Sequence, residues 1–177
     1  MTDYFDLGTY KRRVTTSSSK AQLWFDRGLM WCYGFNHEES VRCFKRATEF
    51  DGDCAMAYWG MAYADGPNYN KPWEFFDEVD MARSCRDAYA ATEKALFLAN
   101  SAPSTERALI EALHYRYPNE AATDDFNVRN DDYAAAMRKV YQLFSDDLDV
   151  CALFSEALIN LTPWALWDLD NGKPAEG

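Results

Sequence analysis

The chain has 177 residues, a length that fits one domain able to bury a core without disulfide or metal support. Hydrophobic residues make up 48% and charged residues 27% of the sequence, a mixture that argues against intrinsic disorder. Acidic residues outnumber basic ones by 29 to 18, and the net charge of -11 makes nucleic acid and anionic membranes poor candidate partners.

The positions of proline and glycine divide the chain into helices, because all six prolines lie outside or at the ends of the apolar-periodic runs. No segment shows the alternation rich in Val, Ile and Thr that is typical of a strand. The expected fold class is therefore all-α. In chain order the pattern predicts a flexible arm over residues 1–17, seven helices over 20–33, 37–50, 54–64, 75–100, 105–117, 131–144 and 148–161, and a frayed tail over 171–177.

Residues 21–54 carry large and small side chains at fixed offsets along the first two helices. The aromatic positions are Trp24 and Trp31, the small ones are Gly28, Ser40 and Ala47, and the large apolar one of the second helix is Phe44. This pattern resembles the tetratricopeptide repeat (TPR), in which antiparallel helix pairs stack because each pair leaves an apolar face for the next. Gly28 is expected where the two helices approach most closely, with room for alanine but not for leucine.

The resemblance implies a TPR-like superhelical stack of antiparallel helix hairpins over residues 18–170. Its repeats would cover about 21–54, 55–100 and 104–144, with a half repeat over 147–167. The longer stretch 28–73 resembles the start of long, mostly uncharacterised TPR-containing proteins of fungi and bacteria, and 160–164 resembles a later part of them. That resemblance implies a fold and no particular chemistry, while leaving open an accessory role in fungal biosynthetic metabolism.

Three irregular segments supply the candidate binding residues. They are His37 at the start of the second helix, the loop residues Asn68, Tyr69, Asn70 and Trp73, and the pair Asn160 and Trp164. The loop is longer than a plain helix–helix turn needs, and its amide and aromatic groups suit ligand recognition. The alternative is that the prolines and Trp73 simply pack the loop over the second repeat.

No catalytic residue, metal ligand or cofactor is assigned from the sequence. His37 and its acidic neighbours are adjacent on a helix, a poor geometry for chelation. The common nucleophile and nucleotide motifs are absent from the sequence.

The leading functional hypothesis is a non-catalytic TPR-like module that binds a protein partner or serves as a scaffold. The alternative is an accessory or catalytic protein of small-molecule metabolism, with a cleft near His37 and the 68–73 loop. The two hypotheses differ in one observable: the alternative gains if the three irregular segments converge on one concave pocket. A clamp for the acidic tails of chaperones is not expected, because Phe25, Leu29 and Gly60 occupy its positions.

Five cysteines, none in a C-x-x-C pair, and the absence of a recognisable secretory leader indicate reduced thiols in a cytoplasmic protein. The longest apolar stretch, residues 54–64, is too short for a membrane span of about 20 residues.

The helix predicted over 148–161 is apolar nearly all round, and no further helix is predicted to cover it. We therefore expect self-association through Phe154, Leu158, Trp164 and Trp167.

Overall fold

The computed structural model describes residues 4–123 and 125–175 of the chain, and within these the fold is all-α. Seven α-helices are present there: α1 (Ser19–Tyr33), α2 (His37–Phe50), α3 (Ala55–Ala64), α4 (Glu78–Leu98), α5 (Ser104–His114), α6 (Phe126–Leu143) and α7 (Leu148–Ile159). Two short 3-10 helices, η1 (Trp73–Phe75) and η2 (Ala99–Ser101), flank α4. The predicted fold class is confirmed.

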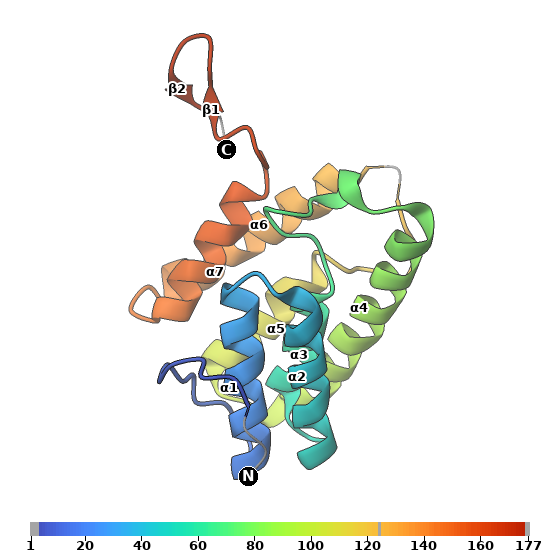
Figure 1. The fold of residues 1–177 in the computed structure, drawn as a ribbon, viewed down its shortest axis with the longest axis vertical. Coiled ribbons are helices and arrows are strands. Elements are labelled where there is room, and N and C mark those ends of the chain that lie inside the picture. The colour runs from blue at the N-terminus through green and yellow to red at the C-terminus, as the bar shows by residue number, and fades with distance from the viewer. Residues whose placement is uncertain (1–3, 124, 176–177) are drawn as a thin grey trace.

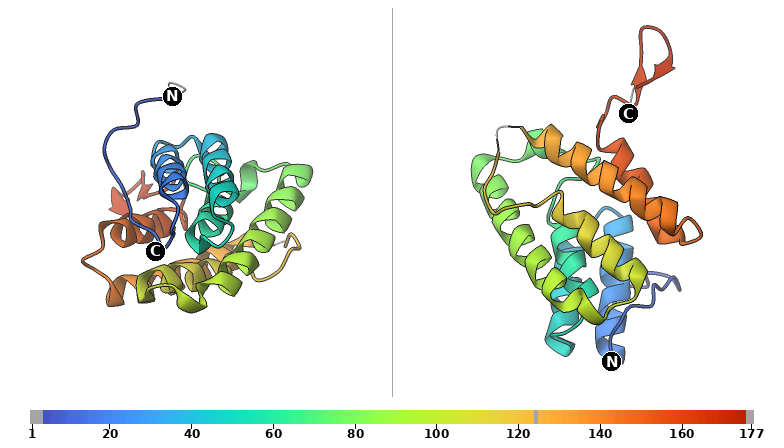
Figure 2. Two further views of the ribbon diagram at one scale, coloured as in Figure 1. Left: turned by 90° about the horizontal axis from the view of Figure 1, so that it is seen from below. Right: turned by 180° about the vertical axis from the view of Figure 1, so that it is seen from behind.

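Helices that follow one another in the chain pack side by side. The most extensive contacts join α1 to α2, α3 to α4, and α2 to α3, and α6 packs on α7. In Figure 1 helices α1 to α3 stand upright, α4 flanks them, and α6 and α7 lie inclined across one end. The view from behind in Figure 2 shows α5 between α4 and the α6–α7 pair.

Side-chain caps set the helix starts. The Ser18 and Asn36 side chains accept hydrogen bonds from the backbones of Ala21 and Glu39, at 3.2 and 3.3 Å. Helix α6 begins at Phe126 rather than at residue 131, because Asp125 caps it through the Asn127 backbone N–H. The sequence prediction missed that start since the preceding segment reads as a polar loop.

The Phe44 ring of α2 sits between two glycines of neighbouring helices. A Cβ placed on Gly28 of α1 would lie 2.7 Å from Phe44 Cδ1, and one on Gly60 of α3 would lie 2.6 Å from the same atom. Phe44 also packs against Phe25, with ring centroids 5.3 Å apart. The Ser40 hydroxyl donates a 2.7 Å hydrogen bond to the buried Gly28 carbonyl. Alanine at Gly28 would therefore force the ring to move, so the expectation that it fits there is wrong.

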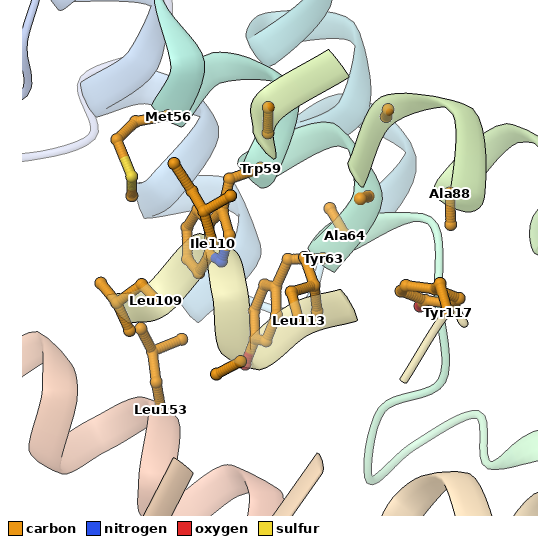
Figure 3. Close-up of a cluster of buried hydrophobic side chains, with 14 of the residues drawn as sticks. Met56, Trp59, Tyr63, Ala64, Ala88, Leu109, Ile110, Leu113, Tyr117 and Leu153 are labelled. Carbon is orange, nitrogen blue, oxygen red and sulfur yellow. The ribbon is translucent and has the colours of Figure 1, made fainter. Parts of the chain in front are cut away.

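Helix α3 is buried on almost every side and forms the centre of the core. Figure 3 shows Met56, Trp59 and Tyr63 of this helix facing Ile110 and Leu113 of α5. An apolar helix of this kind gains stability only when neighbours cover its whole circumference. Helices α2, α4 and α5 provide that cover.

The N-terminal segment is packed against the helices, which corrects the prediction of a flexible arm for residues 4–17. Arg12 Nη1 lies 2.8 Å from both Asp147 Oδ1 and Asp149 Oδ2 at the start of α7. Thr15 donates to Glu106 of α5, and Val14 is buried. Figure 2 shows this dark blue segment running beside α1. The prediction failed because these contacts join residues about a hundred positions apart.

Tyr4 covers the outer face of α1. It stacks edge-on against Trp24 at 5.2 Å, and its hydroxyl accepts a 2.8 Å hydrogen bond from Trp31 Nε1. The two tryptophans of the repeat pattern thus contact the N-terminal segment, and Trp24 also packs against the helical core.

The C-terminal residues form a short antiparallel hairpin of β1 (Trp167–Asp168) and β2 (Lys173–Pro174), which projects from the helices in Figure 1. The sequence pattern predicted no strand and a frayed tail from residue 171. Part of that tail, residues 173 and 174, is paired in the hairpin.

Replacing Gly60 by alanine should lower the free energy of unfolding by about 1–3 kcal/mol, because the new methyl overlaps the buried Phe44 ring. The matched control is Gly52→Ala, where the nearest atom lies 4.0 Å from the added Cβ and stability should not fall. Urea unfolding of both variants measures the difference. Equal stability of Gly60→Ala and the unmodified chain would contradict the packing described.

Replacing Arg12 by methionine should cost about 3 kcal/mol, because Asp149 is 4% exposed and would lose its guanidinium partner. The control is Arg13→Met, which removes an exposed charge of the same segment and should change stability by less than about 0.5 kcal/mol. Thermal unfolding compares the two, and identical melting would show that the segment does not hold α7.

Candidate functional site

The turn between α1 and α2 places His37 against the end of α1. Phe35 adopts a left-handed backbone with φ of 61°, and Asn36 caps α2 so that His37 begins the helix. The His37 Nδ1 lies 3.8 Å from the buried Cys32 sulfur. Burial lowers the pKa of His37, so the imidazole is neutral near pH 7, and burial raises the pKa of the Cys32 thiol to about 12. Among the described residues, His37 Nε2 has no hydrogen-bond partner.

The loop after α3 is a tight turn organised by Asn68. Its side-chain oxygen accepts hydrogen bonds from the backbone N–H groups of Asn70 and Lys71, at 3.0 and 3.1 Å. Gly66 lies directly against Tyr117, where a Cβ would overlap the tyrosine hydroxyl. The loop is therefore fixed at both ends, and Asn68 is 7% exposed.

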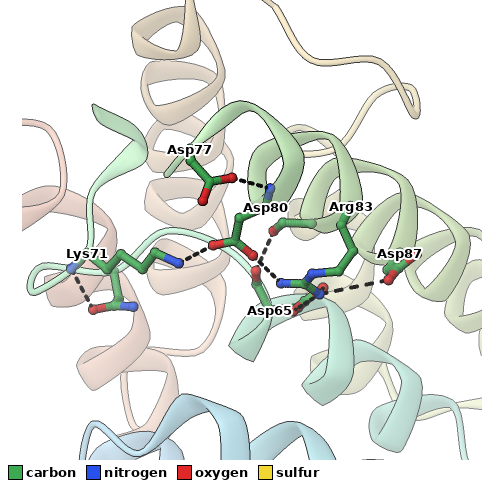
Figure 4. Close-up of polar contacts among 8 residues, drawn as sticks. Asp65, Lys71, Asp77, Asp80, Arg83 and Asp87 are labelled. Atoms are coloured by element: carbon green, nitrogen blue, oxygen red, sulfur yellow. Dashed lines mark hydrogen bonds and ion pairs between the residues drawn. The ribbon is translucent and has the colours of Figure 1, made fainter. Parts of the chain in front are cut away.

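An ion-pair network joins this loop to α4 (Figure 4). Asp80 pairs with Lys71 and, at 2.7 Å, with Arg83, and Arg83 reaches Asp65 at 2.9 Å. Hydrogen bonds from Lys71 and Arg83 lower the pKa of Asp80, whereas burial raises the pKa of Asp65. Because Arg83 is 44% exposed, these pairs position the loop more than they stabilise the fold.

A partly buried carboxylate on α7 lies on the other side of the same region. Glu156 accepts a 3.0 Å hydrogen bond from the Tyr63 hydroxyl and another from the Asn160 amide. The Arg116 guanidinium stands 3.9 Å from Glu156 Oε2 and lies over the Tyr133 ring, 3.8 Å from its centroid. Burial raises the pKa of Glu156, and the Arg116 charge acts in the opposite direction.

Glu156 and Arg116 were not selected from the sequence. The available signal was that Glu156 is the one charged residue in the second half of α7, which is mostly apolar. The partner of such a residue cannot be found from spacing, because Arg116 lies 40 positions earlier, just after the end of α5.

An apolar pocket of about 210 Å³ lies between α1, α3, α7 and the loop. Its larger side chains are Tyr33, Phe35, Tyr63, Pro67 and Ile159. Its polar lining consists of His37, Asn68, Ser155 and Glu156. A charged groove of about 540 Å³ lies on its outer side, between α2, the loop and α4. His37 and Asn68 line both spaces, so they mark the boundary where an apolar pocket meets a charged groove.

The three irregular segments selected from the sequence converge on this region. His37 and Asn68 line the pocket, and Asn160 lies beneath it through its hydrogen bond to Glu156. Tyr69 and Trp164 stack on each other with centroids 5.2 Å apart, which joins the loop to the segment after α7.

Two of the candidate binding residues lie elsewhere. Trp73 is 2% exposed and stacks on Phe126 at 4.2 Å, so it is a core residue and its selection as a binding residue is corrected. Its large ring is drawn into the core by η1, which turns the chain inward after Pro72. Asn70 is exposed at the tip of the turn and lines neither space.

The residues expected to mediate self-association include packed residues on α7 and exposed residues after it. Phe154 is 9% exposed and stacks on Tyr141 of α6, and Leu158 packs against the core. Phe154 thus lies on the side of α7 that α6 covers, which corrects the prediction for this residue, and Leu158 is only partly buried. Trp164 and Trp167 remain 62% and 59% exposed.

The remaining sequence predictions concern the positions of a chaperone clamp, the cysteines, a membrane span and a metal site. Phe25, Leu29 and Gly60 are core residues, and all five cysteines are free thiols. Within the described part of the chain, no helix is both long and apolar enough to cross a membrane. The same residues contain no cluster of three or more His, Cys, Asp or Glu side chains that could hold a metal ion.

The chain was compared with protein-family models, with curated proteins and with solved structures. No match was found. The TPR resemblance therefore continues as a proposal, and function must be argued from the pocket itself.

Replacing Gly66 by alanine should destabilise the chain by about 1–3 kcal/mol, because the new methyl overlaps the Tyr117 hydroxyl. Tyr117→Phe alone should be nearly neutral, since that hydroxyl has no hydrogen-bond partner among the described residues. Combining the two changes should recover part of the lost stability, because the nearest ring atom then lies 3.0 Å away. Thermal unfolding of the four proteins in this cycle measures the recovery, and strict additivity would contradict the contact.

Proposed function

We propose that this chain is a TPR-like helical binding module that holds a small organic molecule in the pocket between α1, α3 and α7. The observation that supports it is the convergence of His37, Asn68 and Glu156 on one mainly apolar space. Small-molecule sites are concave and apolar, with a few polar groups that fix the orientation of the ligand. The volume of about 210 Å³ suits a compact molecule, and the charged groove outside can accept a polar extension of it.

The proposal assigns binding and no reaction. Cys32 lines the pocket, but its pKa of about 12 keeps it a thiol, which is a weak nucleophile at neutral pH. An accessory role in small-molecule metabolism fits such a protein. The five free cysteines fit a reducing compartment, so a cytoplasmic location is part of the proposal.

A second candidate function is contact with a protein partner through the C-terminal end of the chain. Exposed apolar side chains gather in the segment after α7, where Trp164, Trp167 and Leu169 are 62%, 59% and 94% exposed. Exposed tryptophans of this kind are common in protein interfaces. This scaffold function and the ligand pocket use different surfaces.

The pocket is tested by closing it. Ala152 is an exposed residue of α7 that lines the pocket, so Ala152→Trp should fill the entrance without disturbing the core. Ligand-observed NMR with a set of small organic fragments should give hits for the unmodified chain that weaken at least about tenfold in this variant.

The matched control is Ala135→Trp, which adds the same side chain to an exposed position of α6 outside the pocket. Its hits should be unchanged. If fragments bind equally to both variants, or if none binds the unmodified chain, the small-molecule function is wrong and the protein-contact function is favoured.

A further inference from the structure

The hydroxyl groups that line the pocket have already donated their hydrogens. Tyr33 donates to Asp149 at 2.6 Å, Tyr63 donates to Glu156 at 3.0 Å, and Ser155 donates to the Cys151 carbonyl at 2.8 Å. A hydroxyl has one hydrogen and two lone pairs, so each of these groups can now only accept from a ligand. These three hydroxyl groups, from α1, α3 and α7, are therefore hydrogen-bond acceptors for a ligand.

Glu156 adds the strongest acceptor. Its two oxygens receive one hydrogen bond each, from Tyr63 and Asn160, whereas an ionised carboxylate has about four acceptor sites. The Arg116 guanidinium, at 3.9 Å, is too far away for a hydrogen bond to it. A fifth of the Glu156 side chain is accessible, and it borders the pocket. A donor on a ligand can therefore complete its hydrogen bonding.

The surroundings of Glu156 favour a positive charge on that donor. Tyr33, Phe35 and Tyr63 line the pocket, and aromatic faces attract cations. Arg116 is the cation nearest to Glu156, but it is 1% exposed and lies behind the carboxylate rather than among the pocket residues. The cations of the outer groove pair with acidic side chains, Lys71 with Asp80 among them. The net charge of -11 also raises the local concentration of cations around the chain.

We propose that the ligand of this pocket is a small apolar amine, whose ammonium group donates to Glu156 and Ser155 while its apolar part lies against the aromatic side chains. An ammonium supplies three N–H donors to several acceptors, whereas an alcohol supplies only one O–H. The polar side chains of Asn68 and His37, at the boundary with the outer groove, lie beside the other end of the molecule. This inference rests on the proposed function and narrows it to one class of ligand.

Three probes with one apolar skeleton separate the possibilities: 2-phenylethylamine, 2-phenylethanol and 3-phenylpropionate. Ligand-observed NMR titration of the full chain at pH 7 gives their relative affinities. The amine should bind at least about tenfold more tightly than the alcohol, and the carboxylate should bind most weakly, because Glu156 repels it.

Two variants locate the ammonium. Glu156→Gln keeps the shape of the side chain and removes its charge, and should weaken amine binding at least about tenfold with a smaller effect on the alcohol. Glu120→Gln, a change of the same kind at an exposed loop residue, should have no effect. Ser155→Ala tests the same end of the pocket without leaving Arg116 unpaired, since Ser155 is exposed and bonds only within α7. It should weaken amine binding several-fold.

Each outcome has a definite meaning. If the alcohol or the carboxylate binds as tightly as the amine, the ligand class is wrong, while the small-molecule function stands. Unchanged amine binding in both Glu156→Gln and Ser155→Ala also overturns the inference. If none of the three probes binds, the amine class is rejected, and the fragment experiment with Ala152→Trp decides separately whether the pocket binds small molecules at all.

Discussion

The Phe44 ring, held between Gly28 and Gly60, sets the geometry on which the rest of the molecule depends. A side chain larger than hydrogen on either glycine would separate α2 from a neighbouring helix. With both glycines in place, α1 and α3 pack against the same face of α2 and contact each other. Their C-terminal ends therefore lie together, and Tyr33 from one and Tyr63 from the other line the same pocket. The packing of one phenylalanine thus places the walls of the candidate site.

The pocket combines features that cost stability with features that supply it. Burying Glu156 and Arg116 costs several kcal/mol for each ion, and their separation of 3.9 Å recovers only part of that. Phe35, which lines the pocket, adopts a left-handed backbone with φ of 61°, at a cost of about 1–3 kcal/mol. Backbone strain and charged side chains with unfilled hydrogen-bonding capacity around one pocket are typical of a functional site. The apolar core around α3 offsets this cost.

The N-terminal segment contributes to the site through α7. Arg12 holds Asp147 and Asp149, and the Tyr33 hydroxyl reaches the same Asp149. Hydrogen bonds from Arg12 and from the Val150 backbone outweigh burial and lower the pKa of Asp147, so this contact is strongest when the carboxyl is ionised. The start of α7 is thereby attached to the end of α1, and Glu156, two turns further along α7, is positioned over α3. A segment without regular secondary structure therefore holds α7, which forms one wall of the pocket.

The sequence by itself determined the all-α class and the approximate positions of the helices, and it singled out Gly28, Phe44, His37 and Asn68. These features depend on local signals: helical periodicity, capping residues and glycine or proline at helix ends act within a few residues. Only the tertiary structure decided that Glu156 borders the pocket with Arg116 behind it, that Trp73 and Phe154 are core residues, and that residues 4–17 are packed. Each of these depends on which distant segments meet, and that is set by how whole helices pack, for which no local pattern of side chains carries a signal.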